Sequence, residues 1–309
     1  MTLPNHDSLG RRRRDVAVPS GESVHITPRD LVWFEMLHRH GALPLPYLYE
    51  FTKATNRSHR SAVIRATKLF HEQQLLRPHQ QFATLDARYQ TLVYDLAEKA
   101  KMELKAASLW RSRAPQPSPT HWRHDLMLSC FTASIHLATI GTECRYIFQD
   151  EILDRANTNM WFDVGYKIGA KNILLRPDRL FGIQYPNGKV RLFIVEADCG
   201  TETLQSTTHR KTIERNAKQY QAFIAGKLYK DALKVQGGLL LINLTNSADR
   251  MTNMMKVVES AASQGRNAYT LFGCLPQFAR YFKPPKVMTQ LFTDPWPRVG
   301  CDPFQIHVI

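Results

Sequence analysis

Residues 177–198 read PDRLFGIQYPNGKVRLFIVEAD, and this stretch decides the fold of the second half of the chain. Two segments rich in branched and aromatic residues, 178–185 and 190–197, flank the turn Pro186-Asn187-Gly188. Such segments on either side of a proline- and glycine-containing turn are typical of two neighbouring antiparallel strands. The stretch therefore predicts a β-hairpin.

The length of the turn decides which side chains of the hairpin face each other. With a three-residue turn and Gly188 in a left-handed conformation, Tyr185 pairs with Lys189. Asp178 then lies directly opposite Glu196. A two-residue turn would shift the pairing by one residue and place the two acids on opposite faces. We predict the three-residue turn, which brings two carboxylates together.

Facing carboxylates repel each other, so this pair needs positive charge nearby. A divalent cation with oxygen ligands is the simplest source of that charge. Asp198 lies two residues after Glu196 and points to the same side of the strand. We therefore expect Asp178, Glu196 and Asp198 to bind Mg²⁺ or Mn²⁺. Such a metal ion would activate water for attack on a phosphodiester.

The sequence around the hairpin predicts an α/β domain with a central mixed sheet. Further strands are expected at residues 145–148, 239–244 and 268–272, and helices at 121–140, 208–233 and 248–263. The segment from Pro276 onward is rich in proline and aromatic residues. It is expected either to pack back on the core as an extended arm or to dock a partner.

The first block of the chain has a different organisation. Helices are expected at 28–40, capped by Thr27 and ended by Gly41, at 46–51, at 56–74 and at 96–109, with short β segments at 76–84 and 89–94. Three helices followed by a β-hairpin is the order of a winged helix-turn-helix, whose third helix enters the major groove of DNA. An ordinary solvated charged face is the alternative.

Basic residues of the third helix and of the wing are the candidates for contacts with phosphates or guanine edges. They are Arg57, Arg60, Arg65, Lys68, Arg77 and Arg88.

Composition sets broader limits. The 309 residues carry 41 Lys and Arg against 27 Asp and Glu, a net charge of +14, which favours a polyanionic partner. No apolar run approaches the roughly 20 residues that a membrane-spanning helix needs. The five cysteines are odd in number and form no C-x-x-C pair, which argues against a disulfide framework and a zinc ribbon. A reducing, cytoplasmic location is expected.

Two motifs carry a family resemblance. Pro177-Asp178 and, eighteen residues later, Glu196-Ala197-Asp198 resemble the core of PD-(D/E)XK nucleases. Combined with the winged-helix block, they resemble the replication-relaxation family of plasmid and mobile-element proteins. The other residues that carry this resemblance, between about 25 and 245, are His124-Asp125-Leu126, Arg176, Val195–Thr203 and Lys218-Gln219-Tyr220.

The resemblance implies a role in plasmid replication or DNA relaxation, with double-stranded DNA and a replication or mobilisation protein as partners. The nuclease motif has a catalytic lysine where this chain has Asp198. Lys211 and Lys218, from the helix that follows, are the expected substitutes. Glu214 and Lys218 also have the spacing of an ordinary helical ion pair.

Three functions are therefore open, and enzymatic activity is undecided among them. The first is a DNA-binding accessory factor of replication or relaxation with an inactive nuclease-like domain. The second is an active Mg²⁺-dependent endonuclease, and the third is a non-catalytic assembly protein that binds nucleic acid. The expected organisation is a flexible basic arm (1–24), a winged helix (25–110), a proline-rich linker (111–121), a PD-(D/E)XK nuclease-like domain (122–275) and an extended C-terminal arm (276–309).

Overall fold

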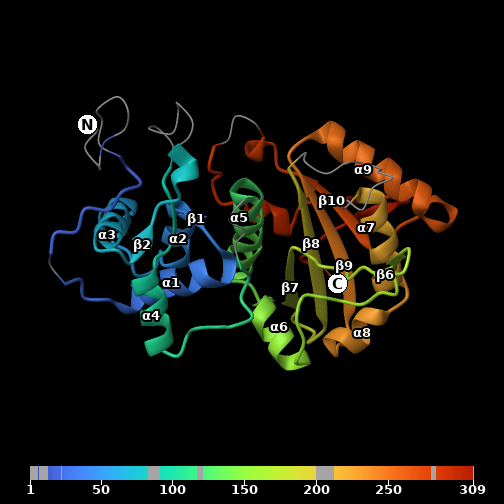
Figure 1. Ribbon diagram of the computed structural model, residues 1–309, viewed down its shortest axis with the longest axis horizontal. Coiled ribbons are helices and arrows are strands. Elements are labelled where there is room, and N and C mark those ends of the chain that lie inside the picture. Colours follow the sequence, from blue (N-terminus) through green and yellow to red (C-terminus); the bar gives the residue numbers. More distant parts are fainter. Residues whose placement is uncertain are drawn as a thin grey trace. The chain divides into compact units, whose positions relative to one another are not determined.

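The computed structural model describes residues 6, 13–21, 23–82, 91–116, 121–199, 212–279 and 283–308 (Figure 1). The chain divides into two compact units. The first falls within residues 1–112, 116–133 and 283–287, and the second within 113–115, 134–282 and 288–309. Among the described residues, no helix is long and apolar enough to cross a membrane.

The first unit combines helices with a small antiparallel sheet of order β1-β3-β2. Its elements are α1 (Pro28–His40), β1 (Leu43–Pro44), α2 (Leu45–Phe51), α3 (His59–His71), β2 (Leu75–Leu76), a 3₁₀ turn (His79–Phe82), β3 (Val93–Leu96), α4 (Glu98–Ala106) and the first part of α5 (Trp122–Thr139). Thr27 caps α1 in a capping box with Asp30, and Gly41 ends the helix at a φ of +100°. Both ends of α1 confirm the prediction.

The β segments of this unit differ from the prediction. Strand β1 was not predicted, because it has only two residues, one of them a proline, and so carries no alternating pattern. The strand predicted at 76–84 is wrong beyond Leu76, since the chain turns into the 3₁₀ segment. The predicted loop 85–88, with Arg88, lies outside the described residues.

The second unit is built on a five-stranded mixed sheet of order β10-β9-β8-β7-β4. Strands β8, β9 and β10 run parallel, whereas β7 and β4 are antiparallel to their neighbours. Its elements are β4 (Arg145–Ile147), α6 (Gln149–Ala156), β5 (Lys167–Ile168), β6 (Lys171–Asn172), β7 (Arg179–Gln184), β8 (Val190–Asp198), α7 (Ile213–Tyr220), a π-helical turn (Gln221–Ala225), α8 (Leu228–Leu233), β9 (Gly238–Thr245), α9 (Ala248–Ala261), β10 (Thr270–Cys274), β11 (Trp296–Arg298) and β12 (Cys301–Phe304). The predicted mixed α/β class and central mixed sheet are thus confirmed.

The hairpin β7–β8 has the predicted register. Arg179 pairs with Val195, and the Tyr185 N–H donates to the Lys189 carbonyl at 2.9 Å. Gly188 has a φ of +77°, the left-handed conformation that the three-residue turn requires. Extending the register by one residue places Asp178 opposite Glu196.

The two faces of the sheet carry different side chains. One face packs aliphatic residues of β7, β8 and β9 against Tyr220 and Phe223, and Figure 1 shows α7 and α9 on this side. On the other face Phe181 stacks on Phe193, with ring centroids 5.0 Å apart. The hairpin β11–β12 packs close to the sheet, because a Cβ at Gly273 would lie 2.5 Å from the Trp296 ring.

The single helix predicted at 208–233 is wrong. The described part begins at Ile213 and widens into the π-helical turn after Tyr220. Lys227 then adopts a left-handed conformation with a φ of +60°, so α8 starts as a separate helix. Helix α6 was also not predicted, although its capping residues Phe148 and Glu151 lie on either side of its start.

Candidate functional site

Two of the three predicted acids, Glu196 and Asp198, lie at the carboxyl end of β8, whereas Asp178 directly precedes β7. Parallel strands bring their carboxyl ends to the same edge of a sheet, so Glu196 pairs with Asn243 of β9 and Asp198 with Thr245. The two acids line a small cavity of about 20 Å³, roughly the space of one water molecule. Its other lining residues are Ala197, Ile213, Asn216, Ala217, Tyr220, Leu241, Asn243, Met254, Val258, Asn267 and Thr270.

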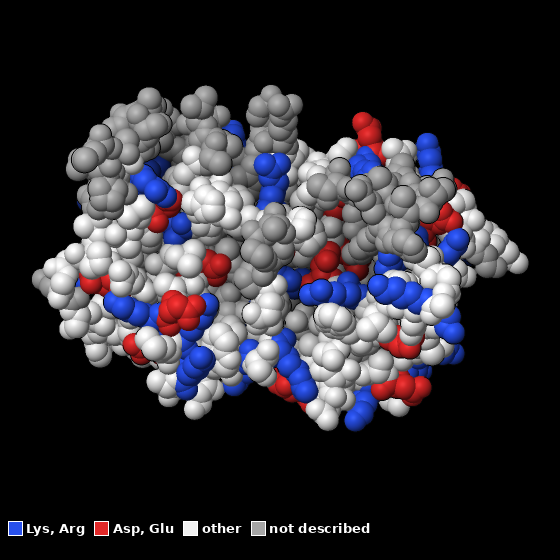
Figure 2. Space-filling view, viewed as in Figure 1, with Lys and Arg blue, Asp and Glu red and all other residues white. Residues whose placement is uncertain are grey.

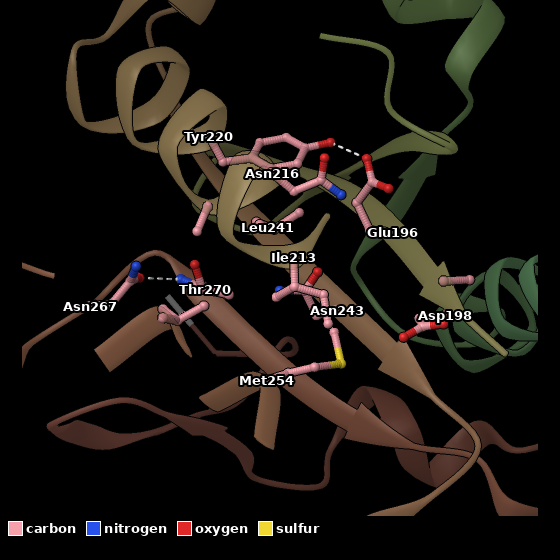
Figure 3. Close-up of a pocket in the computed structure, with 13 residues that line it drawn as sticks. Glu196, Asp198, Ile213, Asn216, Tyr220, Leu241, Asn243, Met254, Asn267 and Thr270 are labelled. Carbon is pink, nitrogen blue, oxygen red and sulfur yellow. Dashed lines mark hydrogen bonds between the residues drawn. The ribbon is translucent and has the colours of Figure 1, made fainter. Parts of the chain in front are cut away.

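Glu196 is held by Tyr220. Figure 3 shows the Tyr220 hydroxyl, on α7, pointing at the Glu196 carboxylate, and it donates a hydrogen bond to Oε1. Both side chains are buried. Helix α7 presents Tyr220 in this position because Thr212 caps its start, accepting from the Arg215 N–H at 3.1 Å, and because Ile213 is buried two turns before Tyr220 on the same helix.

Asp198 is neutralised by Arg250. The Arg250 Nε and Nη2 atoms lie 2.7 and 2.6 Å from Oδ2 of Asp198, whose side chain is 4% exposed. Arg250 lies in the first turn of α9, and the capping residue of this helix, Ser247, comes two residues after the end of β9. The parallel pairing of β8 and β9 therefore brings the start of α9 to the Asp198 side chain.

Asp178 uses its carboxylate to bind the neighbouring strand. Its Oδ2 accepts a hydrogen bond from the Ala197 main-chain N–H at 2.9 Å. The Arg179 guanidinium donates to the main-chain carbonyl of Asp178 at 2.9 Å. The Arg176 guanidinium lies 4.9 Å from the centre of the Trp161 ring. The three acids thus each have a separate polar partner from the protein.

This arrangement does not fit a site in which three carboxylates share one cation. Among the described residues, no group of three His, Cys, Asp or Glu side chains is placed to hold a metal ion. Asp198 already has a guanidinium against one of its oxygens, and a cation next to it would meet that positive charge. Binding of Mg²⁺ or Mn²⁺ by Asp178, Glu196 and Asp198 stays a prediction.

Of the two candidate lysines, Lys218 lies within the described residues and Lys211 does not. Lys218 donates to Glu214 at 2.8 Å, an exposed pair one helical turn apart. This hydrogen bond raises the pKa of Lys218 and favours its protonated form. Lys218 does not line the cavity, which faces Asn216, Ala217 and Tyr220 of the same helix. Lys211 lies outside the described residues, as do Gly200–Thr203 of the family motif.

The basic residues predicted to contact DNA separate into two groups. Arg57, Arg60 and Lys68 are exposed, on or just before α3. Their spacing places them on one helical face with Ile64, whose side chain is 62% exposed. The opposite face of α3 is buried through Ala62, Ala66, Leu69 and Phe70.

Arg65 and Arg77 instead bind other parts of the first unit. Arg65 forms an ion pair with the fully buried Asp30 at 2.5 Å and donates to the His25 carbonyl at 2.6 Å. The Arg77 guanidinium lies 4.0 Å from the centre of the Phe70 ring and donates to the Tyr94 hydroxyl at 3.2 Å. These two arginines hold elements of the unit together.

Figure 2 shows basic and acidic side chains interspersed over the face in view. The net positive charge of the chain is therefore not gathered into one continuous patch on that face.

Sequence reasoning missed Arg250 and the role of Tyr220. One signal could have found Arg250: a buried acid at the motif's lysine position requires a cation from elsewhere. The helix after the adjacent parallel strand is the natural place to look for it, because that helix starts at the same sheet edge.

The replication-relaxation family model matches residues 34–239, about two thirds of the chain. The matched region runs from α1 to the start of β9 and includes α3, Asp178, Glu196, Asp198 and Tyr220, whereas Arg250 lies beyond it. No curated protein and no solved structure matches the chain. The extent of the family match suggests a role in plasmid or mobile-element replication or relaxation, and the chain belongs to the replication-relaxation family.

Proposed function

We propose that this protein is a DNA-binding accessory factor of plasmid or mobile-element replication or relaxation. In this proposal the first unit is a winged helix that binds duplex DNA through α3. The second unit is a nuclease-like domain in which the carboxylates stabilise the fold and do not catalyse cleavage. The exposed face of α3 is the observation that carries the DNA-binding part.

The order α1-β1-α2-α3-β2-β3 of the first unit supports a winged helix, in which the third helix reads the major groove. Arg57, Arg60 and Lys68 are long cations of the kind that contact phosphates and guanine edges. Ile64 lies between them, and an exposed apolar side chain suits contact with a thymine methyl group.

The partners of the acids support the second part of the proposal. A metal-dependent nuclease needs carboxylate oxygens that converge on a cation and a lysine near the attacking water. Here Tyr220 binds Glu196, Arg250 binds Asp198, and the Ala197 N–H binds Asp178. The sole described candidate lysine, Lys218, binds Glu214. Each interaction stabilises the ends of strands or helices where they meet.

Fluorescence anisotropy with a labelled duplex tests the proposal on the full chain. The variant Arg60→Ala/Lys68→Ala removes two cations from the exposed face of α3. We expect weaker binding and a salt dependence, the slope of log K against log salt concentration, that is shallower by roughly 2, since each phosphate contact contributes about 0.9. Lys101→Ala/Lys105→Ala, on α4 of the same unit, is the matched control and should bind like the wild type.

Equal binding by the α3 variant and the wild type would contradict the proposal. Nearly identical unfolding curves for the two variants would show that any difference in binding comes from the DNA contact and not from folding.

A further inference from the structure

A second charged surface lies at the other end of the central strands. It is an open pocket of about 630 Å³ where β8 and β9 begin, lined also by the end of α6 and the segment after α8. Four of its lining residues are cations, and we call it the basic pocket: Arg155, Lys189, Arg191 and Lys234. None of the described residues that line it is acidic.

The basic pocket is separate from the carboxylates. Arg191 and Glu196 lie on the same strand, five residues apart, and a strand advances about 3.3 Å per residue, so roughly 17 Å separates them. The parallel neighbours Gly238 and Asn243 on β9 are separated in the same way. A ligand in the pocket would thus not touch the acidic end of the sheet.

No ion pair with a described residue neutralises any of the four cations. Arg65 of the first unit, by comparison, has a carboxylate partner in Asp30, whereas these four cations lack one within the described ranges. Arg155, Lys189 and Lys234 are exposed, and Arg191 is half-buried with its guanidinium 5.1 Å from the centre of the Phe304 ring. This ring contact orients Arg191 without cancelling its charge.

Two consecutive glycines, Gly237 and Gly238, line the pocket where β9 begins. A Cβ at Gly237 would lie 2.1 Å from the Val190 carbonyl oxygen, so the strands can approach this closely only with glycine at that position. A Cβ at Gly238 would lie 3.7 Å from Nε of Arg191, so the guanidinium runs beside this glycine. Because Gly237 and Gly238 have no side chains, neither position fills the pocket that the four cations line.

We propose that the basic pocket binds the phosphodiester backbone of DNA, as a contact additional to that of α3. The choice of DNA as the polyanion rests on the proposed function. Exposed lysines act as mobile point charges, which suits contact with successive phosphates of a chain more than the oriented binding of one small anion. A groove of cations with no acid is the electrostatic footprint expected of such a surface.

The full chain tests this with Lys189→Gln/Lys234→Gln, which removes two cations from the pocket while keeping polar side chains of similar length. The matched control is Lys171→Gln/Lys256→Gln, two exposed lysines of the second unit that do not line the pocket. Binding of a labelled duplex is measured by anisotropy over a range of salt concentrations, beside Arg60→Ala/Lys68→Ala. Binding of inorganic phosphate is measured by calorimetry on the same proteins.

We expect the pocket variant to bind the duplex more weakly, with a salt slope shallower by about 1 to 2, while the control retains the wild-type slope. If the pocket variant binds like the wild type and the α3 variant binds more weakly, the assignment of the pocket to DNA is wrong and the proposed function stands. Weakened binding by the pocket variant alone would support the pocket and overturn the role of α3. A wild type that binds no duplex would overturn both.

Inorganic phosphate separates a nucleic acid site from a site for a small anion. We expect weak phosphate binding that differs little between the wild type and the variants. Tight phosphate binding that the pocket variant loses, with duplex binding unchanged, would show that the pocket serves a small phosphate compound and that its assignment to DNA is wrong.

Discussion

Arg250 neutralises Asp198 through two nitrogen atoms that approach the same carboxylate oxygen, at 2.7 and 2.6 Å. Asp198 stands where the PD-(D/E)XK motif has its lysine, so the charge at this position of the strand is reversed. The positive charge comes instead from Arg250 in the first turn of α9, the helix that follows β9 in the sequence. A position used for catalysis in the motif is here one half of a buried ion pair.

Replacing Arg250 tests this relationship. Arg250→Met should lower the free energy of unfolding by roughly 3 kcal/mol, because it leaves Asp198 buried without a counter-charge. The double variant Arg250→Met/Asp198→Asn should recover most of this loss, since the uncompensated charge is then gone. Urea unfolding of both variants measures the effect. Lys218→Met, in the exposed pair with Glu214, is the control and should unfold like the wild type. An unchanged Arg250→Met protein would show that Asp198 does not depend on this partner.

The Tyr220–Glu196 hydrogen bond gives a second prediction. Tyr220→Phe removes the hydroxyl and keeps the buried ring, so it isolates the hydrogen bond from the packing. We expect a loss of about 1.5–3 kcal/mol in the free energy of unfolding, the range for hydrogen bonds to charged groups. Combining it with Glu196→Gln in a double-mutant cycle should give less than the sum of the two single effects. Strict additivity would mean that the two side chains do not stabilise each other.

Substitutions of Arg65 and Arg60, both on α3, should affect different properties: the first lowers stability and the second lowers DNA affinity. Burial alone would raise the pKa of Asp30, but hydrogen bonds from Arg65 and Thr27 outweigh it, and the pKa is lowered. Arg65→Ala should therefore destabilise the first unit by roughly 3 kcal/mol at neutral pH. In the wild type this stabilisation is present above the unfolded-state pKa of Asp30 and is lost as the pH falls below it.

Arg60→Ala should leave the unfolding curve unchanged and weaken DNA binding, because Arg60 is exposed. Thermal unfolding and duplex anisotropy on the two variants check the difference. Loss of stability in Arg60→Ala, or none in Arg65→Ala, would contradict the division of α3 into a structural and a DNA-facing side.

The carboxyl of Asp95 on β3 should give the free energy of unfolding a pH dependence opposite in sign to that of Asp30. Burial raises the pKa of its carboxyl from 3.8 to about 6, although the Leu96 N–H donates to it at 2.8 Å. The folded chain thus holds the Asp95 proton more tightly than the unfolded chain, and this contribution to stability falls as the pH rises from about 4 to about 6. Asp95→Asn should increase the free energy of unfolding at pH 7 by at most about 3 kcal/mol and remove this part of the pH profile. A variant that is less stable than the wild type at pH 7 would show that the charged carboxylate is favourable there.

Local chemistry explains what could be predicted from the sequence. The hairpin register follows from Gly188 and the residues of its own turn, and the start of α1 follows from Thr27 and Asp30, three residues apart. The pairing of Asp178 with Glu196 depends only on that register. Features of this kind need no knowledge of the rest of the chain.

The remaining features depend on contacts between distant residues. Asp30 binds Arg65 across 35 positions, so a basic residue on the presumed recognition helix proved to be structural. Arg250 reaches Asp198 across 52 positions because β8 and β9 are parallel neighbours. The break at Lys227 could not be predicted, since a lysine has no intrinsic preference for a left-handed conformation.

Supercoiled plasmid incubated with the wild type or with Asp178→Ala, in the presence of Mg²⁺ or Mn²⁺, tests most directly whether the protein binds DNA without cutting it. When the protein is removed before electrophoresis, the plasmid should remain supercoiled in every lane. When the protein is left bound, both the wild type and Asp178→Ala should retard the plasmid in the gel. Nicked or linear plasmid with the wild type, absent with Asp178→Ala, would contradict a structural role for the carboxylates and identify a metal-dependent endonuclease.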